Sequence, residues 1–298
     1  MIYFALIAIL LSPLPFFVWL RYGKEDDKAG LILKTALTGF FALFVFLAGV
    51  WGILSCYLRY LIPAVFLISI PYRELSRLPF VSGMNQRRVV LLGIRSFFLL
   101  VFIALDITVL KGCFHEGKAY DLSFPLQNGG YYVLQGGNSP VTNLFHLKNP
   151  VQKYALDIVK LDRAGRRAAG IAPKNIDGYF IFGEPVGSPC KGRVIKAVDG
   201  IPDNAPPKMN PEEPAGNHLI IDCEGIEVFI AHLKNGSITV EEGDSVRAGD
   251  VLGKAGNSGN SLEPHIHIHA MKRDGAGLKP APITFGSRFL SLNSVLRN

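Results

Sequence analysis

Three histidines alternate with isoleucines in the stretch PHIHIH, residues 264–269. Alternate side chains of a β-strand project from the same face, so His265, His267 and His269 are expected to share one face of a strand. Neutral imidazole is the commonest transition-metal ligand in proteins. The spacing therefore indicates either a metal site or a solvated strand face that carries histidines by chance.

An ordered series of short segments accompanies these histidines. YALD ends at Asp157, IFGEPVGSPCKGRV spans 181–194, and GNHLIID spans 216–222. Residues 229–269 then read FIAHLKNGSITVEEGDSVRAGDVLGKAGNSGNSLEPHIHIH. The series resembles the lysostaphin-type, or LytM-like, zinc metallopeptidases, many of which cut peptide bonds in bacterial cell walls. The resemblance covers roughly residues 140–285, and its most specific part is AHL, a GDxVxxGDxLGxxGNSGxS run and PHxH in that order.

The resemblance implies a role for four residues and one zinc ion per domain. His267 and Asp157 match zinc ligands, and His265 and His232 match the two catalytic histidines. Three protein ligands leave one position of a catalytic zinc open, and zinc lowers the pKa of its bound water to about 7. Two imidazoles outside the ligand set can then accept the proton of that water and stabilise the oxyanion.

The first ligand departs from the family pattern, which is usually HxxxD. Lys153 stands four residues before Asp157, and a lysine ammonium has no lone pair to offer a metal. In one interpretation zinc is lost, and the domain is an inactive binding module that recruits or activates another cell-wall hydrolase. In the other, His146 supplies the imidazole across a longer loop, whose closure adds less than roughly 2 kcal/mol. The retention of His232 and of the PHxH pair favours the second, with His146, Asp157 and His267 as ligands.

The remaining histidines have no role in the family pattern. His269 is expected to be a polar groove or strand-edge residue, with support of a metal ligand as the alternative. His218 and His115 are expected in turns or at the surface.

The first 112 residues contain long apolar runs, which account for the mean hydropathy of +0.28. Four of these runs are predicted to be transmembrane segments, at residues 2–20, 35–54, 60–71 and 89–110. Basic residues concentrate in the first and third connecting loops, namely Arg21, Lys24, Lys28, Lys34, Arg73, Arg77, Arg87 and Arg88, whereas the second loop holds only Arg59. Positive charge marks cytoplasmic loops, so everything beyond residue 112 is predicted to be extracytoplasmic.

Beyond residue 112, short apolar runs alternate with glycine-containing turns, which is typical of antiparallel β-structure. The predicted fold is therefore an N-terminal α-helical transmembrane bundle followed by a mainly-β domain with a lysostaphin-like groove. The expected divisions are a membrane region at 1–112, a connecting segment at 113–139, the peptidase domain at 140–285 and a C-terminal tail at 286–298. Cys190 and Cys223 are either free thiols or one disulfide.

Composition limits the partners. The net charge of +7 is compatible with nucleic acid, but the chain has no basic stripe interleaved with aromatics and no zinc-finger spacing. The expected function is that of a multi-pass protein of the bacterial inner membrane, a zinc metalloendopeptidase acting on peptidoglycan peptides. The expected partners are that peptide, the lipid bilayer and a regulatory protein of the membrane or cell wall.

Overall fold

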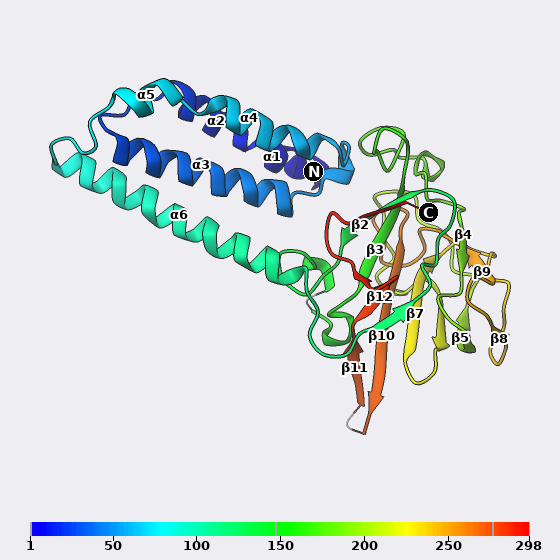
Figure 1. Ribbon diagram of the computed structural model, residues 1–298. Helices are drawn as coiled ribbons and strands as arrows, with labels where there is room; N and C mark the ends of the chain where they lie inside the picture. Colours follow the sequence, from blue (N-terminus) through cyan, green and yellow to red (C-terminus); the bar gives the residue numbers. More distant parts are fainter. Residues whose placement is uncertain (1, 147, 276, 298) are drawn as a thin grey trace. The chain divides into compact units, whose positions relative to one another are not determined.

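The two halves of the chain fold as separate units in the computed structural model, which describes residues 2–146, 148–275 and 277–297. The first unit comprises the chain up to Trp51 together with Tyr57–Leu110. The second comprises Gly52–Cys56 and the chain from Lys111 onward. Figure 1 shows helices in the first unit and mainly strands in the second.

The described part of the first unit contains six α-helices. They are α1 (Ile2–Leu11), α2 (Pro13–Tyr22), α3 (Lys28–Ala48), α4 (Leu61–Ser69), α5 (Tyr72–Arg77) and α6 (Gln86–Gly112). The side chain of Asp27 caps α3 by accepting a hydrogen bond of 2.8 Å from the Gly30 amide. In the described part of the chain, α3 and α6 are the helices that are long and apolar enough to cross a membrane.

Two of the four expected spans are not single membrane-length helices. The segment at 2–20 is divided into α1 and α2 at Ser12, because Pro13 has no amide hydrogen to continue a helix and begins a new one. The segment at 60–71 contains α4, whose nine residues rise about 14 Å, roughly half the hydrocarbon core. The helix expected at 35–54 ends at Ala48, and Gly52–Cys56 belongs to the other unit.

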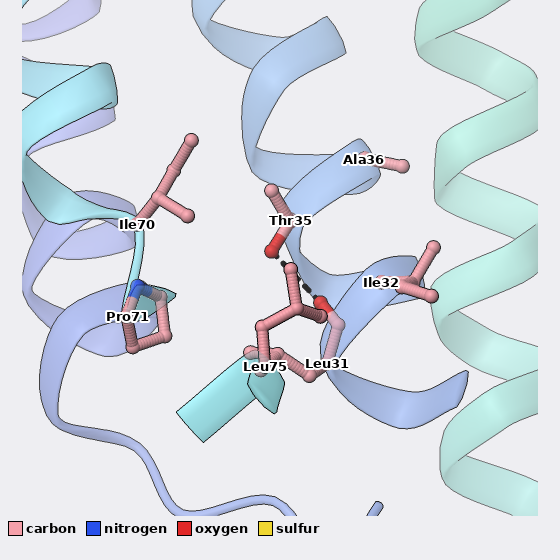
Figure 2. A pocket seen from close by; sticks show the side chains of 7 residues that line it. All are labelled: Leu31, Ile32, Thr35, Ala36, Ile70, Pro71 and Leu75. Atoms are coloured by element: carbon pink, nitrogen blue, oxygen red, sulfur yellow. Dashed lines mark hydrogen bonds between the residues drawn. The ribbon is translucent and has the colours of Figure 1, made fainter. Parts of the chain in front are cut away.

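The first unit also contains a cavity of 270 Å³ between α3 and the α4–α5 connection (Figure 2). Aliphatic side chains line it, and the Thr35 hydroxyl donates its hydrogen bond to the Leu31 carbonyl of its own helix. The lining of the cavity is therefore apolar.

The second unit contains a nine-stranded sheet in the order β14-β2-β3-β10-β7-β6-β5-β8, with β11 paired to β10. Two small sheets, β1-β12-β13 and β4-β9, accompany it. The strands are β1 (Tyr120–Leu122), β2 (Gly130–Gln135), β3 (Leu156–Leu161), β4 (Pro185–Gly187), β5 (Gly192–Val198), β6 (Asn217–Asp222), β7 (Glu227–Leu233), β8 (Ser245–Val246), β9 (Val251–Lys254), β10 (Ile266–Asp274), β11 (Gly277–Ala281), β12 (Ile283–Phe285), β13 (Arg288–Phe289) and β14 (Val295–Arg297). The prediction of a mainly-β C-terminal domain is confirmed.

Alternation along the central strands separates a core face from a polar face. Ile266 and Ile268 of β10 and Ile158 of β3 are fully buried in the main hydrophobic core. His267 and Asp157, which alternate with them, therefore project from the opposite face. The polar face of β10, flanked by β3 and β7, is where the imidazoles gather.

The ends of the β-domain are more ordered than expected. The segment at 113–139 contains β1 and β2, and the described part of the expected tail contains β13 and β14. Because β14 pairs with β2 in the main sheet, both segments contribute to the domain. Cys190 and Cys223 form a disulfide, with Cα atoms 5.8 Å apart.

Candidate metal centre and active site

Three buried side chains meet on the polar face of the sheet: His146, Asp157 and His267. Their nearest nitrogen and oxygen atoms all lie within 4.8 Å of one another. Asp157 of β3 and His267 of β10 are direct partners in the antiparallel register. Oδ1 of Asp157 lies 3.1 Å from Nδ1 of His267 and 3.3 Å from Nε2 of His146. The three groups that the sequence predicts as ligands therefore face one another.

His146 is positioned by a short 3₁₀ turn, Leu144–His146, and by Asn143. The side-chain amide of Asn143 donates to the carbonyls of Lys153 and Ala155, at 3.0 and 3.2 Å. Its Oδ1 is thereby left to accept, and it lies 2.7 Å from Nδ1 of His146. Nδ1 of His146 must carry the proton, so the lone pair is on Nε2, the nitrogen that faces Asp157.

Lys153 lies away from the cluster. Its ammonium pairs with Glu116 at 3.1 Å, and 41% of its side chain is exposed. The position that holds histidine in the usual HxxxD pattern therefore contributes nothing to the site. The imidazole of His146, eleven residues before Asp157 in the chain, lies beside that carboxylate instead.

His265 and His232 lie side by side next to the three-residue cluster, with ring centres 4.8 Å apart. Nδ1 of His265 donates to the Glu263 carbonyl at 2.8 Å, and its Nε2 lies 3.5 Å from Oδ1 of Asp157. Nδ1 of His232 donates to the Ser258 carbonyl at 2.8 Å. Both rings thus carry a proton on Nδ1.

His232 also has an unusual backbone. Its φ of 62° lies in the left-handed region, which residues other than glycine seldom adopt. The β6–β7 register shifts at the same end, between Asn217 and Leu219, and the His232 amide donates outside the ladder to Ala215. Strained backbone of this kind is concentrated at functional sites.

Burial and mutual charge set the protonation of the cluster. Burial raises the pKa of Asp157, but the imidazoles of His146 and His265 outweigh it and hold that pKa well below its usual range. Burial lowers the pKa of His232 strongly and that of His267 less, because Asp157 opposes the effect at His267. Burial also lowers the pKa of His265, but the Asp157 carboxylate outweighs it, so that pKa is raised. An ionised Asp157 carboxylate and a neutral His267 imidazole are the forms that bind a metal cation.

His269 contacts the cluster through His267. Its Nδ1 lies 2.9 Å from Nε2 of His267, and only 3% of the residue is exposed. Because β10 is an interior strand, flanked by β3 and β7, His269 does not lie at a strand edge, and its contact with His267 fits the alternative of support for a metal ligand. His269 therefore contacts Nε2 of His267, the ring nitrogen that faces away from Asp157.

The other two histidines lie outside the cluster. His218 is a buried residue of β6 rather than a turn or surface residue, and its ring stacks on Phe229 at 5.2 Å. His115 lies in a turn, as expected, with Nδ1 3.1 Å from the Gly117 carbonyl.

Several positioning groups were not predicted from the sequence. Asn143, Glu263 and Ser258 each hold the Nδ1 of one histidine. Asn143 stands three residues before His146, a local spacing that could have pointed to it. Ser258 is 26 residues from His232, and no local pattern joins the two.

The residues present fit a zinc ion. Two imidazoles and a carboxylate are a common catalytic donor set for zinc. The two imidazoles turn Nε2 of His146 and Nδ1 of His267 toward Asp157, while Asn143 and His269 hold the other ring nitrogens. Such outer hydrogen bonds orient metal-binding imidazoles and raise their basicity.

Replacement of His146 by alanine tests the least expected ligand. We expect His146→Ala to lose most of its zinc, because one of three donors is removed. His269→Ala should bind zinc about 10- to 100-fold more weakly than the wild type and still be fully occupied at saturating zinc. Competition with a chromophoric chelator measures both affinities. Wild-type zinc affinity in His146→Ala would remove this residue from the ligand set.

One part of the chain matches a known protein family, although His146 and Asp157 lie outside the matched range. Residues 175–280 match the model of peptidase family M23, a range that includes His232, His265 and His267. Among solved structures, the chain is similar to a putative glycyl-glycine endopeptidase LytM from Ruminococcus gnavus, at 16% identity over 90% of this chain and 82% of that one, with a TM-score of 0.33.

Two further structures are a zinc-containing peptidase from Vibrio cholerae and lysostaphin from Staphylococcus simulans. The first is 18% identical over 59% of this chain, with a TM-score of 0.32, and the second is 18% identical over 54%, with a TM-score of 0.29. The chain covers 40% and 47% of their respective lengths, so it spans less than half of each. The match to the family model is confined to residues 175–280, which lie within the second unit.

Proposed function

We propose that this chain is a membrane-anchored zinc metalloendopeptidase that hydrolyses peptide bonds in the stems or cross-bridges of peptidoglycan. The observation that carries the proposal is the group of five residues on the polar face of the sheet. His146, Asp157 and His267 form the candidate ligand set, and His232 and His265 lie beside it, each with Nδ1 donating to a backbone carbonyl. The match to peptidase family M23 supports hydrolysis of a peptide bond.

In this proposal, three side chains of the site bind the metal and two transfer protons. A zinc ion held by His146, Asp157 and His267 would supply a Lewis acid that lowers the pKa of water and polarises a substrate carbonyl. Burial keeps His232 neutral, so its Nε2 can accept a proton. His265 is fixed by the Glu263 carbonyl with Nε2 on the side of Asp157, where it can hydrogen-bond a substrate oxygen or return a proton to the leaving amine.

The alternative is a silent binding module that recruits or activates another wall hydrolase. Its motivation is Lys153 in place of the usual first histidine. The contact of His146 with Asp157 supports the enzyme, since His146 offers the third donor that residue 153 does not supply. Nothing in the described residues favours the module over the enzyme.

Several features support an extracytoplasmic location for the β-domain in a multi-pass inner-membrane protein. α3 and α6 are long and apolar enough to cross a membrane. Gly52–Cys56 and the chain from Lys111 belong to one unit, so both lie on the same side of any membrane that the chain crosses. The Cys190–Cys223 disulfide is typical of an oxidising compartment. The proposed partners are accordingly a peptidoglycan peptide, the bilayer and a regulatory membrane or wall protein.

Reporter fusions test the topology. Alkaline phosphatase joined to the C-terminus should be active, because the enzyme needs the oxidising side of the membrane, and a fusion in the α5–α6 loop at Gly83 should be inactive. Activity only in the Gly83 fusion would contradict the proposed orientation.

Substitution of the two non-ligand histidines tests the chemistry. In the full-length protein, His232→Ala and His265→Ala should each reduce cleavage of purified wall peptides by about 10²–10⁴-fold while zinc stays bound. Mass spectrometry of the digest gives the rates, and metal analysis gives the zinc content. His115→Ala, outside the site, is the matched control. Near-normal turnover in both variants would exclude them from the mechanism, and an inactive wild-type protein with bound zinc would favour the binding module.

A further inference from the structure

The loop between α3 and α4 is built into the β-domain. Gly52–Cys56 belongs to the second unit although helices of the first unit flank it on both sides. The Cys56 amide donates to the Gly165 carbonyl at 2.9 Å, and the Ser55 hydroxyl donates to the Ala164 carbonyl at 2.7 Å. The Cys56 side chain packs with Tyr132, Val159 and Leu161.

This packing is on the face of the sheet that carries the metal cluster. Val159 alternates with Ile158, whose side chain is in the main core, so Val159 shares its face with Asp157. The same alternation applies on β2, where Tyr131 is in the main core and Tyr132 is not. The loop therefore covers β2 and β3 beside the strand that carries His267.

Arg167 connects this loop to the segment that precedes His265. The arginine is 1% exposed, and its Nη1 donates to the Ile53 carbonyl at 3.2 Å. Its Nε and Nη2 donate to the two carboxylate oxygens of Glu263 at 2.6 and 2.7 Å. A buried bidentate pair of this kind fixes both direction and distance, which a single contact does not.

Glu263 in turn positions the proposed catalytic residue His265. Its carbonyl accepts the Nδ1 proton of His265 at 2.8 Å and the Ser261 hydroxyl at 2.9 Å. Hydrogen bonds and one peptide segment thus lead from Ile53, through Arg167 and Glu263, to the imidazole of His265. Neither Arg167 nor Glu263 is in the candidate ligand set.

We propose that full peptidase activity depends on the α3–α4 loop. Arg167, held in place by this loop, is a positioning residue that fixes the orientation of the His265 imidazole. The inference rests on the proposed function. It requires that displacement of the loop lowers kcat, because the imidazole loses its alignment, while KM changes little and zinc stays bound to its separate ligands. The membrane half is then more than an anchor, since it supplies a segment on which catalysis depends.

The loop can be displaced by one substitution with a matched control. A Cβ atom at Gly52 would lie 2.7 Å from Cε1 of Tyr132, whose ring is fully buried, so Gly52→Val must push the loop outward. A Cβ atom at Gly83, in the α5–α6 loop, meets nothing within 4 Å. Gly83→Val therefore makes the same chemical change in another loop of the membrane half without a clash.

A second variant alters the contact between Arg167 and Glu263. Arg167→Lys keeps the positive charge beside Glu263 but removes the planar fork, so the pair loses its bidentate geometry. It tests the same alignment without altering the loop itself.

The experiment compares these full-length proteins in lipid nanodiscs. Zinc content, melting temperature, kcat and KM are measured for the wild type, Gly52→Val, Gly83→Val and Arg167→Lys. We expect kcat to fall by about 10- to 100-fold in Gly52→Val and Arg167→Lys, with zinc retained and KM within about threefold, and to stay at the wild-type value in Gly83→Val.

Other outcomes separate the inference from the function on which it rests. An inactive wild type would refute the proposed function. An active wild type with unchanged kcat in Gly52→Val and Arg167→Lys would overturn the inference alone. Loss of zinc together with activity would also overturn it, because the loop would then support the whole fold rather than His265.

Discussion

The pairing of β3 with β10 is the constraint on which the site depends. It sets Asp157 directly opposite His267, with both side chains on the polar face and their isoleucine neighbours in the core. A slip of one residue in this register would turn the whole set of side chains on a strand to the other face. The burial of Ile158, Ile266 and Ile268 therefore fixes the register, and the register fixes the carboxylate against the imidazole.

The electrostatics of the cluster follow from this placement. A buried carboxylate is stable only where cations or hydrogen bonds compensate its lost hydration. Imidazoles surround Asp157, and the second ring nitrogen of each has a partner of its own: Asn143 for His146, Glu263 for His265 and His269 for His267. The Asn143 and Glu263 oxygens can only accept, so they place a proton on Nδ1 of His146 and of His265 and leave Nε2 of each ring toward the carboxylate.

Much of the β-domain could be predicted from the sequence because the alternation in PHIHIH directly encodes a strand with two different faces. The grouping of Asp157 with His267 and His265 could be predicted from the family motif. The departure at Lys153 pointed to His146, which lies beside Asp157, although its role as a ligand stays a prediction.

Other features depended on contacts that no local pattern records. His269 was expected in a polar groove or at an edge, because the sequence does not reveal which strand becomes central. The role of Gly52–Cys56 in the β-domain arises from packing against β2 and β3, more than seventy residues away in the chain. In the N-terminal half, hydropathy located the apolar segments but not the break at Ser12 or the shortness of α4.

Anomalous X-ray diffraction at the zinc absorption edge, from crystals of the full-length protein prepared with zinc, would locate the metal relative to its ligands. We expect one peak about 2.0–2.2 Å from Nε2 of His146, an oxygen of Asp157 and Nδ1 of His267. No peak at this cluster, or a peak bonded to His269 or His218 with His146 turned away, would contradict this expectation.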